Sequence, residues 1–529
     1  MPSHRIRRLV RLVAAAAALI LVAGSMPAQA APGGNGKAGF KTSVAAMVKP
    51  GADAPAGVII EPLVTVGDTL PNGFTFDSIP DGISINPRGN GRVDLYVNHE
   101  TSLVPFPGIL TDFTNSHVDK LVVNQHSGGI LHGSDVIPSD ANYQRFCSNF
   151  LAGPEQGFDR RILFTNEEAT DTVNRTGLAW PAIADVGSDP EQAGVVVALD
   201  IRTGEYRSIY GMGRHNHENS VAIPGFDELV VLSGDDTFTA PSSQVYSYIA
   251  PNTDAVWNDT GALWAFVGET GFNDYGDLVL GDDISGHFIP VPRNIAIGNQ
   301  TGLENWSNEN NVFQFIRIED IAYDRNNPRI VYLADTGEPR AIPGGAGDRL
   351  ARGPSGTMGP YPNGRIFQMV LNADDPTVVD SMSILIDADP LGAGNPDALH
   401  QPDNIETTAT SLLIQEDTGG HNQFDLGTGP GARVWQYTFG TGTLKAVLEV
   451  DQSLDGAAGY DMGGGIARAG GWESSGIVDA SSIWGPGWFL VDVQAGSLIL
   501  ESEAGFLGPN AVVFEREGGQ LLRVKIPGA

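Results

Sequence analysis

RIEDIAYDRNNPRIVYLADT, residues 317–336, is the stretch that decides the fold. Arg317 and Glu319 stand two residues apart, so their side chains point to the same side of an extended segment. The apolar run 330–334 then ends in an acid, Asp335, as expected of a short buried strand bounded by polar residues. The stretch therefore predicts two neighbouring strands with acidic side chains at their ends.

The same pattern recurs along the chain. Six apolar runs lead into Asn, Asp or Glu, and these polar residues are spaced 68 to 100 residues apart. They are Asn98, Asn166, Asp235, Asp335, Glu416 and Asp492. A repeat of this length suits a four-stranded sheet with insertions.

A second acid lies 13 to 19 residues upstream of four of these positions. These four acids are Glu218, Glu319, Asp403 and Glu473. Each pair predicts two adjacent antiparallel strands whose acids meet at one edge of a sheet. Among the four, only Glu319 has an arginine two residues before it. Thr-Gly turns between apolar runs, at residues 203–204 and 441–442, predict a further hairpin in each unit.

Small sheets repeated around an axis are the propeller solution to open sheet edges. The chain is therefore predicted to be all-β, a six-bladed β-propeller with helical and loop insertions over one mouth. Glycine supplies 67 of the 529 residues, which fits many tight turns. A pair of packed β-sandwich domains is the alternative, but it does not explain why acids recur at one strand end.

The N-terminus predicts export from the cytoplasm. Arginines precede an apolar core, and a small-residue site predicts cleavage near Ala30-Ala31. The core is too short for a membrane span, and both Sec and twin-arginine export stay open. The predicted organisation is a signal peptide at 1–30, a flexible leader at 31–55 and a single propeller domain at 56–529, with insertions near 105–157 and 251–311.

The chain is strongly acidic, with a formal net charge of −32. Such a chain is repelled by phosphate backbones, so we expect no nucleic-acid partner. The acids either keep an exported protein soluble or bind hard cations. Cys147 is the only cysteine, so it forms no internal disulfide. Its thiol is expected to be buried, reactive or a metal ligand.

Acids at corresponding strand ends of a propeller form a ring around the central channel. Carboxylates gathered in this way repel one another unless cations neutralise them, and oxygen ligands suit calcium. A thiolate from Cys147 favours a transition metal such as iron. The candidate acids are Glu100, Glu167, Glu168, Glu218, Asp235, Asp236, Glu319, Asp335, Asp403, Glu416, Asp417 and Asp492. His99 and His217 precede acids and are ligands, neighbours of ligands or ordinary hydrogen-bonded histidines.

Several of these motifs, taken in order, resemble the signature of the PhoX-type alkaline phosphatases, which are exported bacterial six-bladed propellers. The resemblance spans roughly residues 60–500. Its motifs are Arg145-Phe146-Cys147-Ser148, Phe164-Thr165-Asn166-Glu167-Glu168, His217-Glu218, Gly234-Asp235-Asp236, Arg317-Ile318-Glu319 and Gln401-Pro402-Asp403-Asn404. The chain has Asn166 where the family often has Gly, and Asp320 where the family has Gly after the glutamate.

The resemblance implies a cluster of iron and calcium ions at the propeller mouth. It implies that Arg317 grips the phosphate through its guanidinium fork and that Glu319 takes part in catalysis. The implied ligands near iron are Cys147, Glu168, Glu218 and Glu319. The implied ligands near calcium are Glu167, Asp236, Asp403 and Asp417.

The predicted function is that of an exported, metal-dependent phosphatase that hydrolyses phosphomonoesters of small molecules. One alternative is a calcium-only propeller hydrolase of the lactonase or phosphotriesterase sort. The other is a non-catalytic propeller that binds calcium. A monomer is expected, because a propeller closes on itself.

Overall fold

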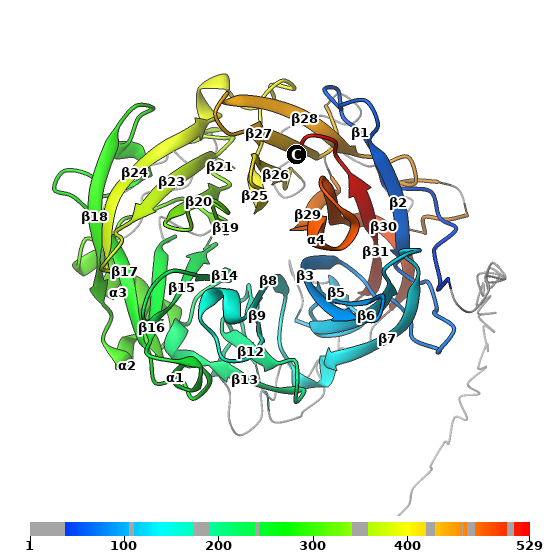
Figure 1. Ribbon diagram of the computed structural model, residues 1–529, viewed down its shortest axis with the longest axis horizontal. Helices are drawn as coiled ribbons and strands as arrows, with labels where there is room; N and C mark the ends of the chain where they lie inside the picture. Colours follow the sequence, from blue (N-terminus) through cyan, green and yellow to red (C-terminus); the bar gives the residue numbers. More distant parts are fainter. Residues whose placement is uncertain are drawn as a thin grey trace, which may run out of the picture.

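The protein is described from a computed structural model that covers ten parts of the chain. They are residues 38–104, 110–173, 175, 191–237, 243–340, 358–418, 429–457, 459–462, 471–504 and 513–529. Most of these residues form strands, and the strands form small sheets arranged around a central axis (Figure 1). The prediction of an all-β propeller is confirmed. The predicted signal peptide, residues 1–30, lies outside the described residues.

The described strands form six radial units, and each unit begins with the strand nearest the axis. The first unit contains β3 (Pro80–Gly89), β4 (Arg92–His99), β6 (His117–Asn124) and β7 (Ile130–Ile137). The second contains β8 (Phe146–Ala152), β9 (Ile162–Glu167), β12 (Val196–Asp200) and β13 (Glu205–Ile209). The third contains β14 (His217–Ile223), β15 (Leu229–Asp235), β16 (Val245–Ala250) and β17 (Ala262–Gly268).

The other three units follow in chain order. The fourth contains β19 (Ile318–Tyr323), β20 (Ile330–Asp335), β23 (Arg365–Leu371) and β24 (Val378–Asp387), and β18 (Asp283–Pro290) joins β24 to β17. The fifth contains β25 (Pro402–Thr407), β26 (Ser411–Glu416), β27 (Arg433–Thr438), β28 (Thr443–Val450) and β1 (Val48–Pro50). The sixth contains β29 (Glu473–Asp479), β30 (Trp488–Ala504), β31 (Val513–Lys525) and β2 (Ile59–Thr65).

A few short elements decorate this ring. Strand β5 (Leu110–Asp112) lies parallel to β31, and two small ribbons pair β10 (Thr172–Val173) with β11 (Glu191–Gln192) and β21 (Glu338–Arg340) with β22 (Met358–Tyr361). The helices are α1 (Thr253–Trp257), α2 (Arg293–Ala296), α3 (Gln300–Glu309) and α4 (Ser481–Trp484). No helix among the described residues is long and apolar enough to cross a membrane.

The ring is closed by strands from both ends of the chain. Strand β2, near the N-terminus, pairs antiparallel with β31, near the C-terminus. Each inner strand contacts the inner strands of the two neighbouring units, including β29 with β3. The cores lie between neighbouring sheets, where apolar side chains of adjacent units pack together. Such closure leaves only short, protected sheet edges.

The predicted leader is wrong from residue 38 onward, because this segment belongs to the fold. Phe40 bridges to Ile130, and β1 pairs with β28. Met47 is fully buried, and its backbone N–H donates a hydrogen bond of 2.8 Å to Gln520. The Gly, Ala, Pro and Lys content suggested flexibility, but a few apolar side chains suffice to anchor the segment.

The two predicted insertions also need correction. Residues 105–157 contain the outer strands β6 and β7 of the first unit and the inner strand β8 of the second. Residues 251–311 contain β17 and β18 besides the helices, and α2 and α3 pack against β16 and β17 through Ala296 and Leu303 (Figure 1). Strands β6, β7, β8 and β18 carry polar side chains among their apolar ones, so their apolar alternation is weak in the sequence, whereas β17 is apolar throughout.

Candidate metal centre

Each inner strand is irregular at the same place, where its pairing with the second strand shifts register. The shift begins at Pro80, Phe146, His217, Ile318, Pro402 and Ser474. A bulge re-aims the side chains that follow it. The residues that come next are Asp81, Cys147, Glu218, Glu319, Asp403 and Ser475. Five of the six units therefore present an acid or the thiol at one level of the axis.

In five units, the residue directly after the second strand supplies another polar side chain at this level. The backbone N–H of Glu100 donates to the carbonyl of Ile79, two residues before Asp81, at 3.0 Å. The same bond holds Glu168 to Arg145, Asp236 to Asn216, Thr336 to Arg317 and Asp417 to Gln401, at 2.9 to 3.0 Å. One backbone arrangement thus sets the second ligand position in five units.

Three overlapping groups of side chains come close enough to share cations. Potential ligand atoms lie within 4.8 Å of one another in each group. The groups are Asp81, Glu100 and Cys147; Cys147, Glu168 and Glu218; and Glu218, Asp236 and Glu319. Because Cys147 and Glu218 each belong to two groups, the three form one continuous cluster, which we call the channel cluster.

Burial and mutual repulsion make the charged forms of these acids unfavourable. Burial, followed by the charges of Glu319 and Glu168, raises the pKa of Glu218 well above its usual range. Burial also raises the pKa of Asp81 to about 6, and burial together with the charge of Asp81 raises that of Glu100 to about 8. The cluster must therefore bind either protons or cations.

Two features of the donor set fit cations. Among the described residues, Asp81 Oδ1, Glu218 Oε2 and Asp403 Oδ1 are buried carboxylate oxygens that have no hydrogen-bond partner. Such oxygens are costly in a folded protein unless an ion or water satisfies them. Carboxylates suit calcium, and a thiolate among them suits a transition metal.

Cys147 lies at the centre of the cluster. Its Sγ donates a hydrogen bond of 2.9 Å to Asp81 Oδ2. Burial and the surrounding acids, Asp81 first, raise the pKa of the thiol well above its usual range. Without a metal the sulfur therefore stays protonated, and metal binding would have to displace this proton.

Arg317 is buried within the acids. Its Nε and Nη2 donate to the two carboxylate oxygens of Asp236, both at 2.7 Å, and Nη2 lies 2.7 Å from Glu319 Oε1. This is the bidentate geometry that a guanidinium uses for a planar anion. Arg317 is not the single arginine of the ring, however, because Arg145 holds the equivalent position before Cys147 and pairs with Asp171 at 2.6 Å.

The backbone before three of the ligands is strained. Ile79, Arg145 and Gln401 have φ angles of 47°, 43° and 48°, although none is glycine. Each stands two residues before an inner-strand ligand. Left-handed conformations of such residues cost of order 1–3 kcal/mol each and persist where the surrounding structure imposes them. Strain at three equivalent positions indicates that ligand placement is built into the fold.

Most of the predicted ligands come together. Those at the axis are Cys147, Glu168, Glu218, Asp236, Glu319, Asp403 and Asp417, together with Arg317. Asp403 lies close to the other acids at the axis. Burial raises its pKa, and the charges of Glu473, Glu319 and Glu218 raise it further. Asp417 lies near enough to Glu473 and Glu319 to raise the pKa of both.

Glu167 does not join them, so its predicted role as a ligand is wrong. Its oxygens accept hydrogen bonds from the Arg175 guanidinium at 2.9 and 2.7 Å and from the backbone N–H groups of Gln144, Gly194 and Val195. Successive side chains of a strand point in opposite directions. The side chain of Glu168 therefore points toward the central axis, and that of Glu167 points away from it. Asp335 is used in a similar way, as the acceptor for backbone N–H groups, and Glu416 accepts from both the backbone and the guanidinium of Arg433.

Two acids of the site were missed as ligands. Asp81 belongs to the cluster, and Glu473 shares a hydrogen bond with Asp403. The signal for Asp81 was present, because Pro80-Asp81-Gly82 parallels Pro402-Asp403-Asn404. The sequence comparison also predicted that Glu473 occupies the position in its unit that Glu319 occupies in the fourth unit. The strand register instead places Ser475 at that position.

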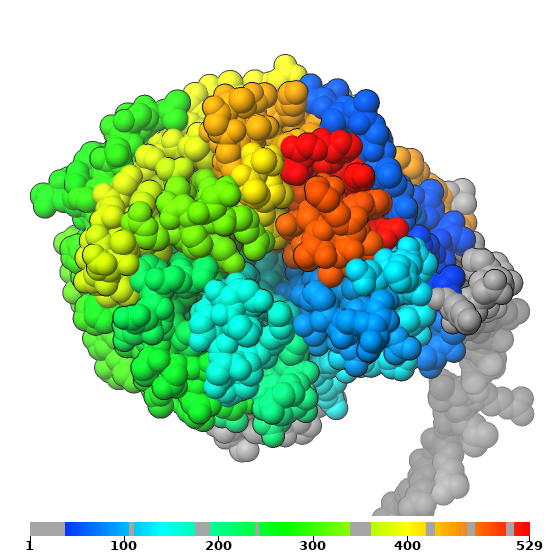
Figure 2. Space-filling view, in the orientation of Figure 1, coloured from blue at the N-terminus to red at the C-terminus, as the bar shows by residue number. Residues whose placement is uncertain are grey.

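The cluster is accessible from one side and continues into a cavity on the other. Glu100, Glu168, Asp417 and Glu473 are only partly buried. Further along the inner strands lies a cavity of about 220 Å³, whose lining includes Ser148, Asn219, Asp320 and Asn404. The units also leave a recess where they meet at the centre of the face shown in Figure 2.

Comparisons with known proteins assign no family to the chain. No family model matches it, and no curated protein matches it. The resemblance to PhoX-type phosphatases therefore remains a prediction.

Several solved structures are similar at low identity. A protein of unknown function from Dyadobacter fermentans is 7% identical over 89% of this chain and 100% of its own, with a TM-score of 0.43. A mutant NanB sialidase from Streptococcus pneumoniae is 6% identical over 88% and 70%, with a TM-score of 0.40. A candidate 6-phosphogluconolactonase from Bacteroides uniformis is 10% identical over 80% and 82%, with a TM-score of 0.31. Likenesses this weak assign no activity to the chain.

Proposed function

We propose that the protein is a metal-dependent hydrolase whose substrates are phosphomonoesters of small molecules. The observation that carries this proposal is the channel cluster, in which acids and a thiol surround one buried arginine fork. An anionic substrate is repelled by bare carboxylates, so cations must bind before the substrate does. Export of the mature protein and a monomeric state are parts of the same proposal.

The donor set suggests how the cluster would hold its cations. Cys147, Glu168, Glu218 and Glu319 would hold iron, because they include the sulfur ligand. Asp236, Asp403 and Asp417 would hold calcium through oxygen alone. When bound, these cations would polarise the phosphoryl oxygens and offset the charge that develops on them.

The chain's own residues would orient the phosphate. Arg317 already donates two parallel hydrogen bonds to the planar carboxylate of Asp236, and a phosphate offers the same pair of acceptors. With Asp236 holding a cation, the fork would be available to the substrate. Glu319, 2.7 Å from Arg317 Nη2, holds the guanidinium in place and can accept a proton at Oε1.

Hydrolysis of 4-nitrophenyl phosphate by the purified mature chain tests this function. The wild type, supplied with calcium and iron, should be active, and Arg317→Ala and Cys147→Ser should each lose at least about 100-fold in kcat/KM. Arg202→Ala is the matched control, because Arg202 is exposed and distant from the axis. If the wild type hydrolyses no phosphomonoester and the two variants leave the bound metals unchanged, the proposal fails.

A calcium-only hydrolase acting on lactones or phosphotriesters is the second candidate. It is favoured by the hydrogen bond from the Cys147 thiol to Asp81, which leaves the sulfur protonated. It predicts calcium without iron by elemental analysis, and full activity in Cys147→Ser. Calcium without activity on any of these esters would instead support the non-catalytic propeller.

A further inference from the structure

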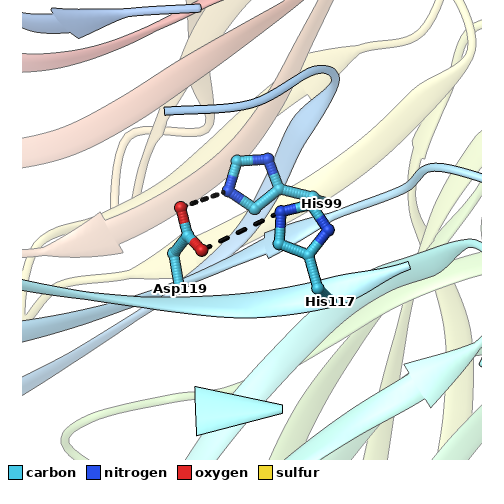
Figure 3. Close-up of side chains that lie close together, drawn as sticks. All are labelled: His99, His117 and Asp119. Carbon is cyan, nitrogen blue, oxygen red and sulfur yellow. Dashed lines mark hydrogen bonds and ion pairs between the residues drawn. The ribbon is translucent and has the colours of Figure 1, made fainter. Parts of the chain in front are cut away.

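A second cluster of potential ligands lies inside the first unit, apart from the axis. His99 of β4 stands directly opposite His117 of β6, and Asp119 follows on the same face of β6 (Figure 3). The two imidazole rings stack with their centroids 4.3 Å apart and their planes 5° from parallel. All three side chains are buried.

Both histidines use Nδ1 in a hydrogen bond to a backbone carbonyl. His99 Nδ1 donates to the backbone carbonyl of Ser78 at 2.9 Å, and His117 Nδ1 donates to that of Asn115 at 3.3 Å. A carbonyl only accepts, so each Nδ1 carries the proton. Metal-binding histidines typically use their second nitrogen in this way, which fixes the ring and leaves Nε2 for the metal. Here both Nε2 atoms face Asp119.

The carboxylate of Asp119 leaves one oxygen unsatisfied. Its Oδ2 lies 2.9 Å from His99 Nε2, but its Oδ1 lies 3.9 Å from His117 Nε2, too far for a hydrogen bond. Asp119 Oδ1 is buried and has no hydrogen-bond partner among the described residues. Zinc bonds of about 2.0–2.1 Å at tetrahedral angles place neighbouring ligand atoms about 3.3 Å apart, between these two distances.

A second carboxylate lies beside Asp119. Asp135 of β7 pairs directly with Asp119, and its side chain is exposed. Two acids opposite each other in a sheet repel, unless a proton or a cation lies between them. Asp135 therefore connects the buried ligands with solvent and provides a route by which a cation could enter.

We propose that His99, His117, Asp119 and Asp135 form a zinc site within the first unit. Two imidazoles and two carboxylates suit Zn²⁺, and four protein ligands make a closed, structural site rather than a catalytic one. Binding would replace the proton between His99 and Asp119 and tie β4, β6 and β7 together. Because His99 precedes Glu100, the site would also fix the end of the strand that carries a channel-cluster ligand. The proposal does not depend on the proposed function.

Zinc content and zinc ligation test the proposal. The mature protein, expressed with added Zn²⁺ and dialysed, is measured by elemental analysis and X-ray absorption as wild type, His117→Gln and His126→Gln. His126 is exposed, so its variant controls for the loss of a histidine. We expect one zinc per chain with imidazole and oxygen neighbours in the wild type and in His126→Gln, and none at this site in His117→Gln.

Asp135→Asn provides a second variant, since this exposed side chain can be changed without disturbing the core. It should weaken Zn²⁺ binding about tenfold or more, measured by competition with a chromogenic zinc chelator. Equal zinc content in the wild type and His117→Gln would overturn the proposal. So would sulfur as a zinc neighbour, which would place the zinc at Cys147, or the absence of zinc from the wild type.

Discussion

Two acids that are adjacent in the sequence, Glu167 and Glu168, lie in opposite environments. Glu167 points into its sheet, where five hydrogen bonds satisfy its carboxylate. Glu168 points to the axis, where burial and the charges of Glu100 and Asp236 raise its pKa. Glu416 likewise accepts hydrogen bonds from the Arg433 backbone and guanidinium inside its sheet, whereas Asp417, the next residue, lies near Glu473 and Glu319 at the axis. Glu167 and Glu416 are therefore structural acids satisfied by the protein, whereas Glu168 belongs to a buried acid cluster whose members require protons or cations.

The largest expected effect is on the sheet side. Glu167→Gln would leave the Arg175 guanidinium without its main partner, and removal of one member of a buried ion pair costs about 3–5 kcal/mol. Urea denaturation of the chelated protein measures this loss in the free energy of unfolding. A cost below about 1 kcal/mol would contradict the structural role of Glu167.

On the axis side, substitution should cost function rather than stability. Glu218→Gln removes a charge from the cluster, so the chelated variant should be as stable as the chelated wild type or more stable. Its bound metal and its phosphatase activity should fall by at least about 100-fold, equivalent to about 2.7 kcal/mol of transition-state stabilisation. Metal content and kcat/KM are the readouts. Destabilisation comparable to that of Glu167→Gln would erase the distinction between the two sides.

The pH dependence of stability sharpens the comparison further. The folded-state pKa values of Asp81 and Glu100 are raised to about 6 and about 8. A carboxyl whose pKa is raised on folding binds its proton more tightly in the folded state, so stability is lost as the pH rises. The chelated protein should therefore become less stable between about pH 4 and pH 8.

Calcium should flatten this dependence, because it replaces the protons. Urea midpoints measured across this range, with and without calcium, provide the test. Stability that rises with pH in the chelated protein would show that the axis acids are already compensated.

The smallest expected effect on stability is that of Cys147→Ser. Serine keeps a donor to Asp81 in place of the thiol, so the chelated variant should change by less than about 1 kcal/mol. Its iron content should nevertheless fall sharply while calcium remains, as elemental analysis would show. Unchanged iron would mean that the sulfur is not a ligand.

The fold could be predicted from the sequence because its strongest signal is local. Apolar runs ending in acids mark the second strands, and their recurrence predicts the radial arrangement. The outer strands were harder to recognise. Strand β6, for example, carries Asp119 and Lys120 between its apolar residues, and Asp119 is used inside the unit rather than at its surface.

The candidate site was predicted only in part, because its details depend on register. Strand pairing decides which acid of a doublet points to the axis. The irregularities in the inner strands shift this pairing, and no sequence pattern indicates where they occur. Arg145 escaped notice as the counterpart of Arg317 for the same reason, since the two correspond only once Cys147 and Glu319 are aligned. Asp81 could have been found through its Pro-Asp motif, which matches that of Asp403.

The seam between β2 and β31 has a consequence for the order in which the protein matures. From β30, in the same sheet as this seam, Gln494 donates hydrogen bonds to the first unit, to Asp81, 413 residues earlier in the chain, and to Glu100. A ribosome therefore completes the first ligands long before the strand that closes the ring around them. Contacts between such distant residues form late in folding. The channel cluster is thus assembled at the end of folding, and its cations must enter a ring that has closed or is closing around them.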